Sequence, residues 1–117
     1  MKAKRKLDAT CCSTSARHDG GDLRPVEGSD ADAELAMLAK ALGHPIRVRI
    51  VRMLSRREAR VCSEIVNEVP LAQSTVSEHL RILKQAGLIR ASTNGTKTGY
   101  CIDASTLRRM KALAAGL

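Results

Sequence analysis

Aromatic residues are almost absent from this chain of 117 residues, which has one tyrosine and neither tryptophan nor phenylalanine. Nucleic-acid modules that stack two or three bases on aromatic side chains are therefore excluded, and a sugar pocket or an aromatic cage is disfavoured. The longest apolar runs are short, such as residues 112–115, so we expect no transmembrane helix. No apolar segment follows the basic N-terminus, which argues against a secretory signal and favours a cytoplasmic protein.

Motifs of catalysis are also missing. The sequence has no Cys-x-x-Cys pair, no hydrolase order of Ser, His and Asp, and no glycine-rich phosphate loop. We therefore expect neither an enzyme nor an organic cofactor. What the chain has in excess is positive charge, with 20 Lys and Arg against 12 Asp and Glu and a net charge of +8. This balance favours an anionic partner, nucleic acid above all.

The chain divides near residue 30. Residues 1–29 lack a periodic apolar pattern and carry Gly20-Gly21, Pro25 and Gly28, which is typical of a mobile arm. Residues 30–117 show helical periodicity and predict a folded domain. The expected organisation is an arm followed by one small domain.

Cap residues and apolar spacing place the first two helices. The first is expected over about residues 32–42, with Ser29 or Asp30 as its cap and Gly43 as its end. Pro45 opens the second, because proline at the first helical position loses no hydrogen bond. The second helix also carries arginines that we expect on a solvated face: Arg47, Arg49, Arg52, Arg56 and Arg57.

The next two helices are separated by only a few residues. A short helix is expected from Cys62-Ser63 to about Val69-Pro70, and a fourth carries Val76, Leu80 and Leu83 on one face. Gly87 ends the fourth helix. Two helices joined by so tight a turn form a helix-turn-helix.

A β-hairpin follows this pair. Asn94-Gly95 lies between two β-prone segments, which is a strong hairpin signal, and a last helix is expected over about residues 103–115. A hairpin directly after a helix-turn-helix is a wing. The predicted fold is mainly α with a small β-hairpin, a winged helix-turn-helix with helices at both ends.

The outward face of the fourth helix predicts DNA contacts. Amide, hydroxyl and basic side chains suit base edges and phosphates in the major groove. Phosphate would repel Glu78, so Glu78 either accepts from a cytosine amine or neutralises an arginine, and His79 is expected to pack at the helix edge. An ordinary solvated helix could carry similar residues, but the tight turn, the wing and the positive charge favour DNA. The candidate contacts are Gln73, Ser74, Thr75, Ser77, Glu78, Arg81 and Lys84, with Lys97 in the wing.

Two segments resemble the ArsR/SmtB family of metal-responsive repressors. They are ALGHPIRVRIVRML at residues 41–54 and QSTVSEHLRILKQAGLI at residues 73–89, and the likeness extends over roughly residues 32–115. The resemblance implies a homodimer built on the first and last helices. It also implies that double-stranded operator DNA is bound without metal and released when metal binds.

The cysteines bear on the inducer. One family branch uses Cys-x-Cys at the start of the third helix, but here only Cys62 is present and Ser63 stands where a second cysteine would be expected. Another branch uses Asp and His on the last helix, and although Asp103 is present, no histidine follows His79. The adjacent pair Cys11-Cys12 remains, because adjacent thiolates can bind one soft ion together.

Cys11, Cys12 and Cys62 together supply three thiolates, which is the number that As(III) or Sb(III) accepts. The set resembles family members that bind As(III) through an N-terminal vicinal pair and one third-helix cysteine, with one or two protomers contributing. Cd(II), Pb(II) and Zn(II) usually take a fourth ligand, for which His18 or Cys101 is available, so these ions remain alternatives. Further alternatives are a thiol-redox repressor of the same fold and a plain architectural DNA-binding or protein-interaction module. Cys101 itself is interpreted as structural or idle.

Overall fold

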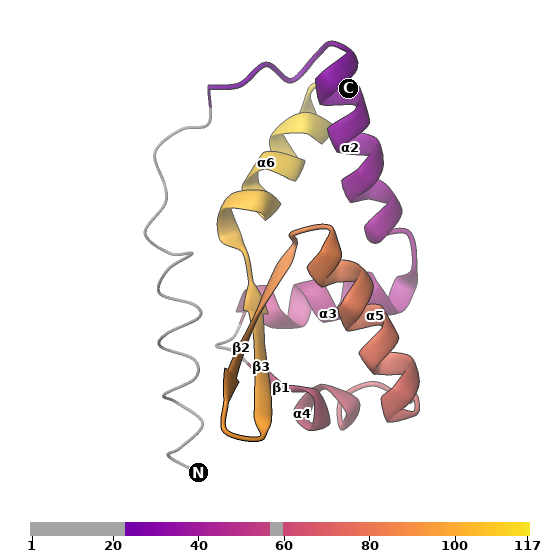
Figure 1. Ribbon diagram of the computed structural model, residues 1–117. Coiled ribbons are helices and arrows are strands. Elements are labelled where there is room, and N and C mark those ends of the chain that lie inside the picture. Colours follow the sequence, from indigo (N-terminus) through magenta and orange to yellow (C-terminus); the bar gives the residue numbers. More distant parts are fainter. Residues whose placement is uncertain (1–22, 57–59) are drawn as a thin grey trace.

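The computed structural model describes residues 23–56 and 60–117 and contains a winged helix-turn-helix (Figure 1). Its elements in chain order are α2 (Ser29–Ala41), α3 (Pro45–Arg56), β1 (Arg60–Val61), α4 (Cys62–Val66), α5 (Gln73–Gln85), β2 (Ile89–Asn94), β3 (Lys97–Ile102) and α6 (Ala104–Ala115). The predicted fold class is therefore confirmed. Within these ranges, no helix combines the length and the apolar character that crossing a bilayer requires.

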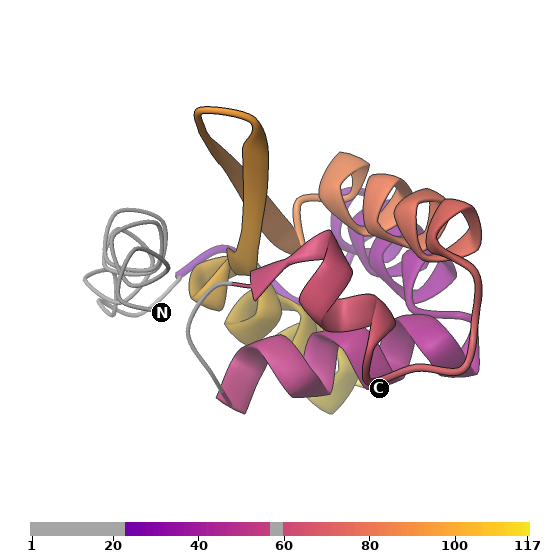
Figure 2. The same ribbon diagram turned by 90° about the horizontal axis from the view of Figure 1, so that it is seen from below.

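The helix-turn-helix is built around one shared core. Figures 1 and 2 show α5 lying across α3, with α4 closing the end of the pair next to the start of α5. The apolar stripe predicted on α5 is confirmed, because Val76, Leu80 and Leu83 are at most 1% exposed. They meet side chains that are equally buried on α3, on α4 and after α5: Ile50, Leu54, Ile65 and Leu88.

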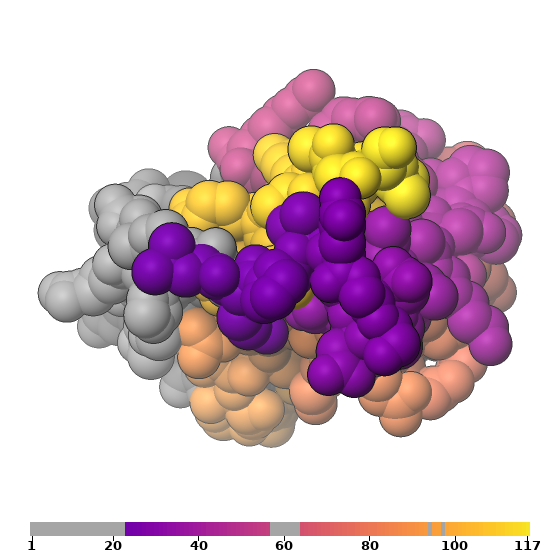
Figure 3. All heavy atoms as spheres, turned by 90° about the horizontal axis from the view of Figure 1, so that it is seen from above, coloured from indigo at the N-terminus to yellow at the C-terminus, as the bar shows by residue number. Residues whose placement is uncertain are grey.

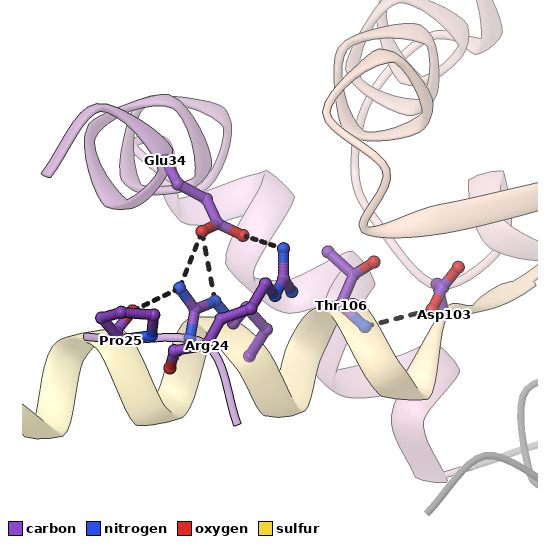
Figure 4. A network of polar contacts seen from close by, with 6 residues as sticks. Arg24, Pro25, Glu34, Asp103 and Thr106 are labelled. Carbon is purple, nitrogen blue, oxygen red and sulfur yellow. Dashed lines mark hydrogen bonds and ion pairs between the residues drawn. The ribbon is translucent and has the colours of Figure 1, made fainter. Parts of the chain in front are cut away.

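Local signals set several helix ends as the sequence predicted. Pro45 opens α3, and Gly87 follows α5 with a φ of 86°, which glycine adopts without strain. The carboxylate of Asp103 accepts a hydrogen bond from the amide of Thr106 at 3.1 Å and so caps α6 (Figure 4). Each of these helix ends is set by residues that lie no more than four positions apart in the sequence.

Two predicted helix boundaries are wrong. Ser29 and Asp30 lie inside α2, whose N-cap is Gly28 with no side-chain hydrogen bond, so the helix begins three residues before the expected Asp32. The helix α4 ends at Val66 rather than near Val69, because the amides of Glu68 and Val69 donate to carbonyls only three residues back. The link to α5 is therefore a chain of tight turns.

The wing differs from its prediction in one detail and gains a strand. Asn94 pairs with Lys97, so the two-residue tip is Gly95-Thr96 rather than Asn94-Gly95. Gly95 has a φ of 70°, as the first central residue of a type II′ hairpin turn requires. The unpredicted strand β1 pairs with β3 through Arg60 opposite Tyr100, which gives the strand order β1-β3-β2.

At the end remote from the wing, α2 and α6 lie side by side (Figures 1 and 3). Arg109 of α6 is 4% exposed and was not expected in the core. Its Nε and Nη2 donate to one carboxylate oxygen of Glu34 on α2, at 3.1 and 3.0 Å. Its Nη1 and Nη2 also donate to the backbone carbonyls of Arg24 and Pro25, at 3.1 and 2.7 Å. Residues 23–28, which the sequence assigned to the arm, are thereby attached to the helical layer.

The second oxygen of Glu34 faces the guanidinium of Arg24 at 3.7 Å, as Figure 4 shows. The nearer and more buried Arg109 is therefore the main partner of Glu34. Because a buried guanidinium needs both a countercharge and hydrogen-bond acceptors, Glu34 stabilises the whole arrangement.

We predict that Glu34→Gln lowers the free energy of unfolding by about 2 kcal/mol, since Arg109 stays buried without its countercharge. The measurement is urea denaturation at a fixed protein concentration. The matched control is Asp32→Asn, which removes the same charge from the same helix at an exposed position. The control should cost only about 0.5 kcal/mol. Equal losses in the two variants would contradict the stabilising role of Glu34.

Candidate nucleic-acid interface

The outward face of α5 is polar along its whole length. Because the apolar stripe faces α3 and α4, the opposite side of the helix is left to solvent. All seven candidate contacts on α5 are exposed: Gln73, Ser74, Thr75, Ser77, Glu78, Arg81 and Lys84. Gln85 is exposed beside them. This face has the size and chemistry to enter a major groove.

An ion pair between Glu78 and Arg81 lies on this face. Arg81 donates from Nε to Glu78 Oε1 at 3.0 Å, its Nη2 contacts Glu78 Oε2, and its Nη1 donates to Gln85 Oε1 at 3.0 Å. The hydrogen bond from Arg81 lowers the pKa of Glu78, and the carboxylate raises the pKa of Arg81 in return. Of the two roles expected for Glu78, the structure shows the neutralisation of an arginine. Arg81 is thus held along the helix rather than projecting freely.

The wing supplies the remaining candidate. Lys97 opens β3 and pairs with Asn94 at the base of the Gly95-Thr96 tip. The side chain of Lys97 lies outside the described part of the chain. In Figure 2 the wing projects on the same side of the molecule as α5. A recognition helix and a wing on one side can address adjacent grooves of one duplex.

His44, Arg47 and His79 form a cluster between the start of α3 and the buried side of α5. The rings of His44 and His79 lie 4.5 Å apart between centroids, and Arg47 Nη1 lies 3.2 Å from His79 Nδ1. His79 is 8% exposed, so its predicted packing role is confirmed. Arg47 is half-buried, so its assignment to a solvated face is wrong, whereas Arg49, Arg52 and Arg56 are exposed as expected. Arg57 lies outside the described residues.

The cysteines are placed only in part. Cys11 and Cys12 lie outside the described residues, and so does the side chain of Cys62, although its backbone begins α4. Cys101 is fully buried on β3 and is disulfide-bonded. In the parts of the chain that the structure describes, no three His, Cys, Asp or Glu side chains gather as a metal site.

Comparison with known proteins decides the family. Residues 44–91, which run from the His44 cluster through the helix-turn-helix into the wing, match the model of the bacterial regulatory protein, arsR family. A transcriptional regulator of the helix-turn-helix type from Methanocaldococcus jannaschii is 37% identical over 67 residues, which cover 57% of this chain and 75% of that protein. The chain belongs to the ArsR family. It is a helix-turn-helix transcription regulator and not an enzyme.

Two kinds of relative refine this assignment. The transcriptional repressor SmtB of Mycobacterium tuberculosis is 38% identical over 76 residues, which cover 65% of this chain and 53% of the repressor. A crystal structure described as a possible transcriptional regulator for arsenical resistance has a TM-score of 0.62 and 28% identity, covering 68% of this chain and 81% of its own.

A solution structure from Mycobacterium bovis is described as a homodimeric winged helix-turn-helix DNA-binding domain. It has a TM-score of 0.62 and 26% identity, covering 84% of this chain and 87% of its own. These relatives place the chain among the DNA-binding repressors of the ArsR/SmtB type.

We predict that Glu78→Gln strengthens binding to a duplex of arbitrary sequence, because it removes a negative charge from the DNA-facing side and releases Arg81 to meet phosphate. The slope of log K against log salt should steepen by about 0.9, the value for one added phosphate contact. Fluorescence anisotropy across a salt series measures it. The control is Glu27→Gln, which makes the same charge change at an exposed position ahead of α2. An unchanged slope in Glu78→Gln would mean that Arg81 does not reach phosphate.

Proposed function

We propose that this ArsR-family regulator represses transcription by binding operator DNA as a homodimer and that it releases the operator when As(III) or Sb(III) binds to Cys11, Cys12 and Cys62. The observation that carries the DNA half is the exposed polar face of α5 on a helix whose other face is fully buried. Base contacts are assigned to Gln73, Ser74, Thr75 and Ser77, and phosphate contacts to Lys84 and Lys97; Arg81 joins them when it is released from Glu78.

The dimer is assigned to α2 and α6. Met37 on α2 is 49% exposed, and alanines are exposed on both helices: Ala33, Ala36, Ala112 and Ala115. A surface of small apolar side chains lets a second copy of the helices approach closely. The homodimer described for the M. bovis relative supports this assignment. Two copies of α5 would then read two operator half-sites.

The choice of As(III) or Sb(III) as the inducer follows from the chemistry of sulfur. As(III) and Sb(III) are thiophilic, and three thiolates saturate them. Ten residues lie between Cys12 and Leu23, where the described chain begins, and this part of the chain spans up to about 40 Å when extended. This length supports ligation by Cys11 and Cys12 of the arm together with Cys62, within one protomer or between two.

The place of Cys62 gives the release mechanism. Cys62 is the first residue of α4, and α4 is the first helix of the helix-turn-helix. A bond between the arm and this point would change the freedom or the angle of α4, and α5 packs directly on α4. By linkage, DNA and inducer must weaken each other's binding by the same factor.

The test uses an operator duplex of about 30 base pairs that the protein selects from a random pool. Arsenite should lower the affinity of the parent by roughly 100-fold, about 3 kcal/mol. Cys62→Ser should bind the duplex normally and ignore arsenite, because one ligand is lost. With all cysteines kept reduced in every sample, Cys101→Ala is the control, since it removes a cysteine outside the trio and should keep the response.

Release of Cys62→Ser by arsenite as readily as the parent would overturn the assignment of the ligands, and selection of no duplex would overturn the DNA-binding function. Antimonite, cadmium, lead and zinc are titrated in parallel. A response to cadmium, lead or zinc without one to arsenite would replace the inducer.

A thiol-redox response is the second candidate, and the disulfide of Cys101 favours it. The chain has four cysteines, so a disulfide of Cys101 within one chain takes its second sulfur from the proposed trio. Hydrogen peroxide would supply the oxidant, because two thiols and one peroxide give a disulfide and two waters. Release of the operator by peroxide but not by arsenite, abolished in Cys101→Ala, would establish this function instead.

A further inference from the structure

The guanidinium of Arg47 connects the end of α2, which is assigned to the dimer, with α5, the helix proposed to read DNA. Arg47 Nε donates to the carbonyl of Ala41, the last residue of α2, at 2.6 Å. The Nη1 of the same side chain lies 3.2 Å from Nδ1 of His79, in the middle of α5. His79 points inward and belongs to none of the groups that could touch DNA. The contact therefore positions α5 without reading any base.

The protonation state of His79 follows from this partner. A guanidinium has only donors, so Nδ1 of His79 must accept, and the ring is neutral with its proton on Nε2. The His44 ring is fixed beside it, because His44 Nδ1 accepts from the amide of Ile46 at 3.1 Å. The charged and titratable groups acting on His79 are His44 and Arg47 at the start of α3, and Glu78 on α5.

We propose that His79 is a positioning residue for operator reading, and that proton uptake at its Nδ1 releases Arg47 and weakens operator binding. The inference rests on the proposed function, because it needs an operator complex to act on. It adds a group that touches no DNA and a response to acid that needs no metal.

Protonation of His79 replaces its attraction to Arg47 with a repulsion. Nδ1 would then carry a hydrogen that faces Arg47 Nη1, so the acceptor is lost and two cations meet at a part-buried contact. Glu78 precedes His79 and Leu80 follows it, so a displacement at this point moves the centre of the reading face.

The direction of the pH effect is fixed. Burial lowers the pKa of His79, with His44 and Arg47 adding to the effect and Glu78 opposing it. The contribution of His79 to stability is complete above the ordinary histidine pKa of about 6.5 and is lost as the pH falls below it, because the unfolded chain takes up the proton first. Positive charge added to a protein generally strengthens its binding to DNA. Weaker operator binding in acid is therefore the specific sign of proton uptake at His79.

The experiment measures the affinity of the full-length protein for the selected operator duplex at pH 7.5 and pH 5.0, at constant salt and with a thermal melt at each pH. The parent should lose affinity about fivefold or more, since binding that requires a deprotonated group weakens by up to tenfold per pH unit below its pKa. His79→Gln keeps an acceptor for Arg47 but cannot take up the proton, so its affinity should not fall. His18→Gln is the control and should behave as the parent.

Two results would overturn the inference. One is a parent whose affinity does not fall in acid while the protein stays folded, and the other is a loss in His79→Gln equal to that of the parent. Nitrogen NMR of the parent gives an independent reading, in which a neutral His79 carrying its proton on Nδ1 at pH 7.5 would also overturn it. Absence of operator binding at pH 7.5 would instead count against the proposed function.

Discussion

The burial of one face of α5 is the constraint on which the rest of the structure depends. Val76, Leu80 and Leu83 are almost fully buried, and each such side chain contributes roughly 1.5–3 kcal/mol through the hydrophobic effect. The helix is thereby fixed to the core of the domain. The backbone that carries the polar face, from Gln73 to Gln85, is fixed with it, so the helix that could read DNA is placed before DNA arrives.

Most of the fold followed from signals within a few residues of one another. The apolar spacing on α5, Pro45 before α3 and Gly87 after α5 each act through neighbours in the same turn. The exposed candidates on α5 could be predicted for the same reason, because a helix with one apolar face must present its other face to solvent. The hairpin was predicted, but its tip shifted by one residue, since the pairing of Asn94 with Lys97 leaves Gly95 and Thr96 as the turn.

What the sequence could not show are contacts between residues far apart in the chain. Arg109 and Glu34 are separated by 75 positions, and Arg47 and His79 by 32. An arginine in a helical sequence indicates a solvated position, because burial of its guanidinium is favourable only where each N–H donor has a hydrogen-bond acceptor. Those acceptors include backbone carbonyls of Ala41, Arg24 and Pro25, which no residue pattern reveals.

These two arginines hold α2 from both ends. Arg109 of α6 binds the carbonyls just before α2, and Arg47 of α3 binds the carbonyl of its last residue. The chain therefore enters the described fold at a point tied to α6, passes along α2, and meets the contact that positions α5 through His79. These contacts form a contiguous set that runs from residues 24–25 to α5 and does not include the wing. Because the contacts at both ends of α2 are hydrogen bonds donated by a buried or half-buried guanidinium, both are sensitive to charge.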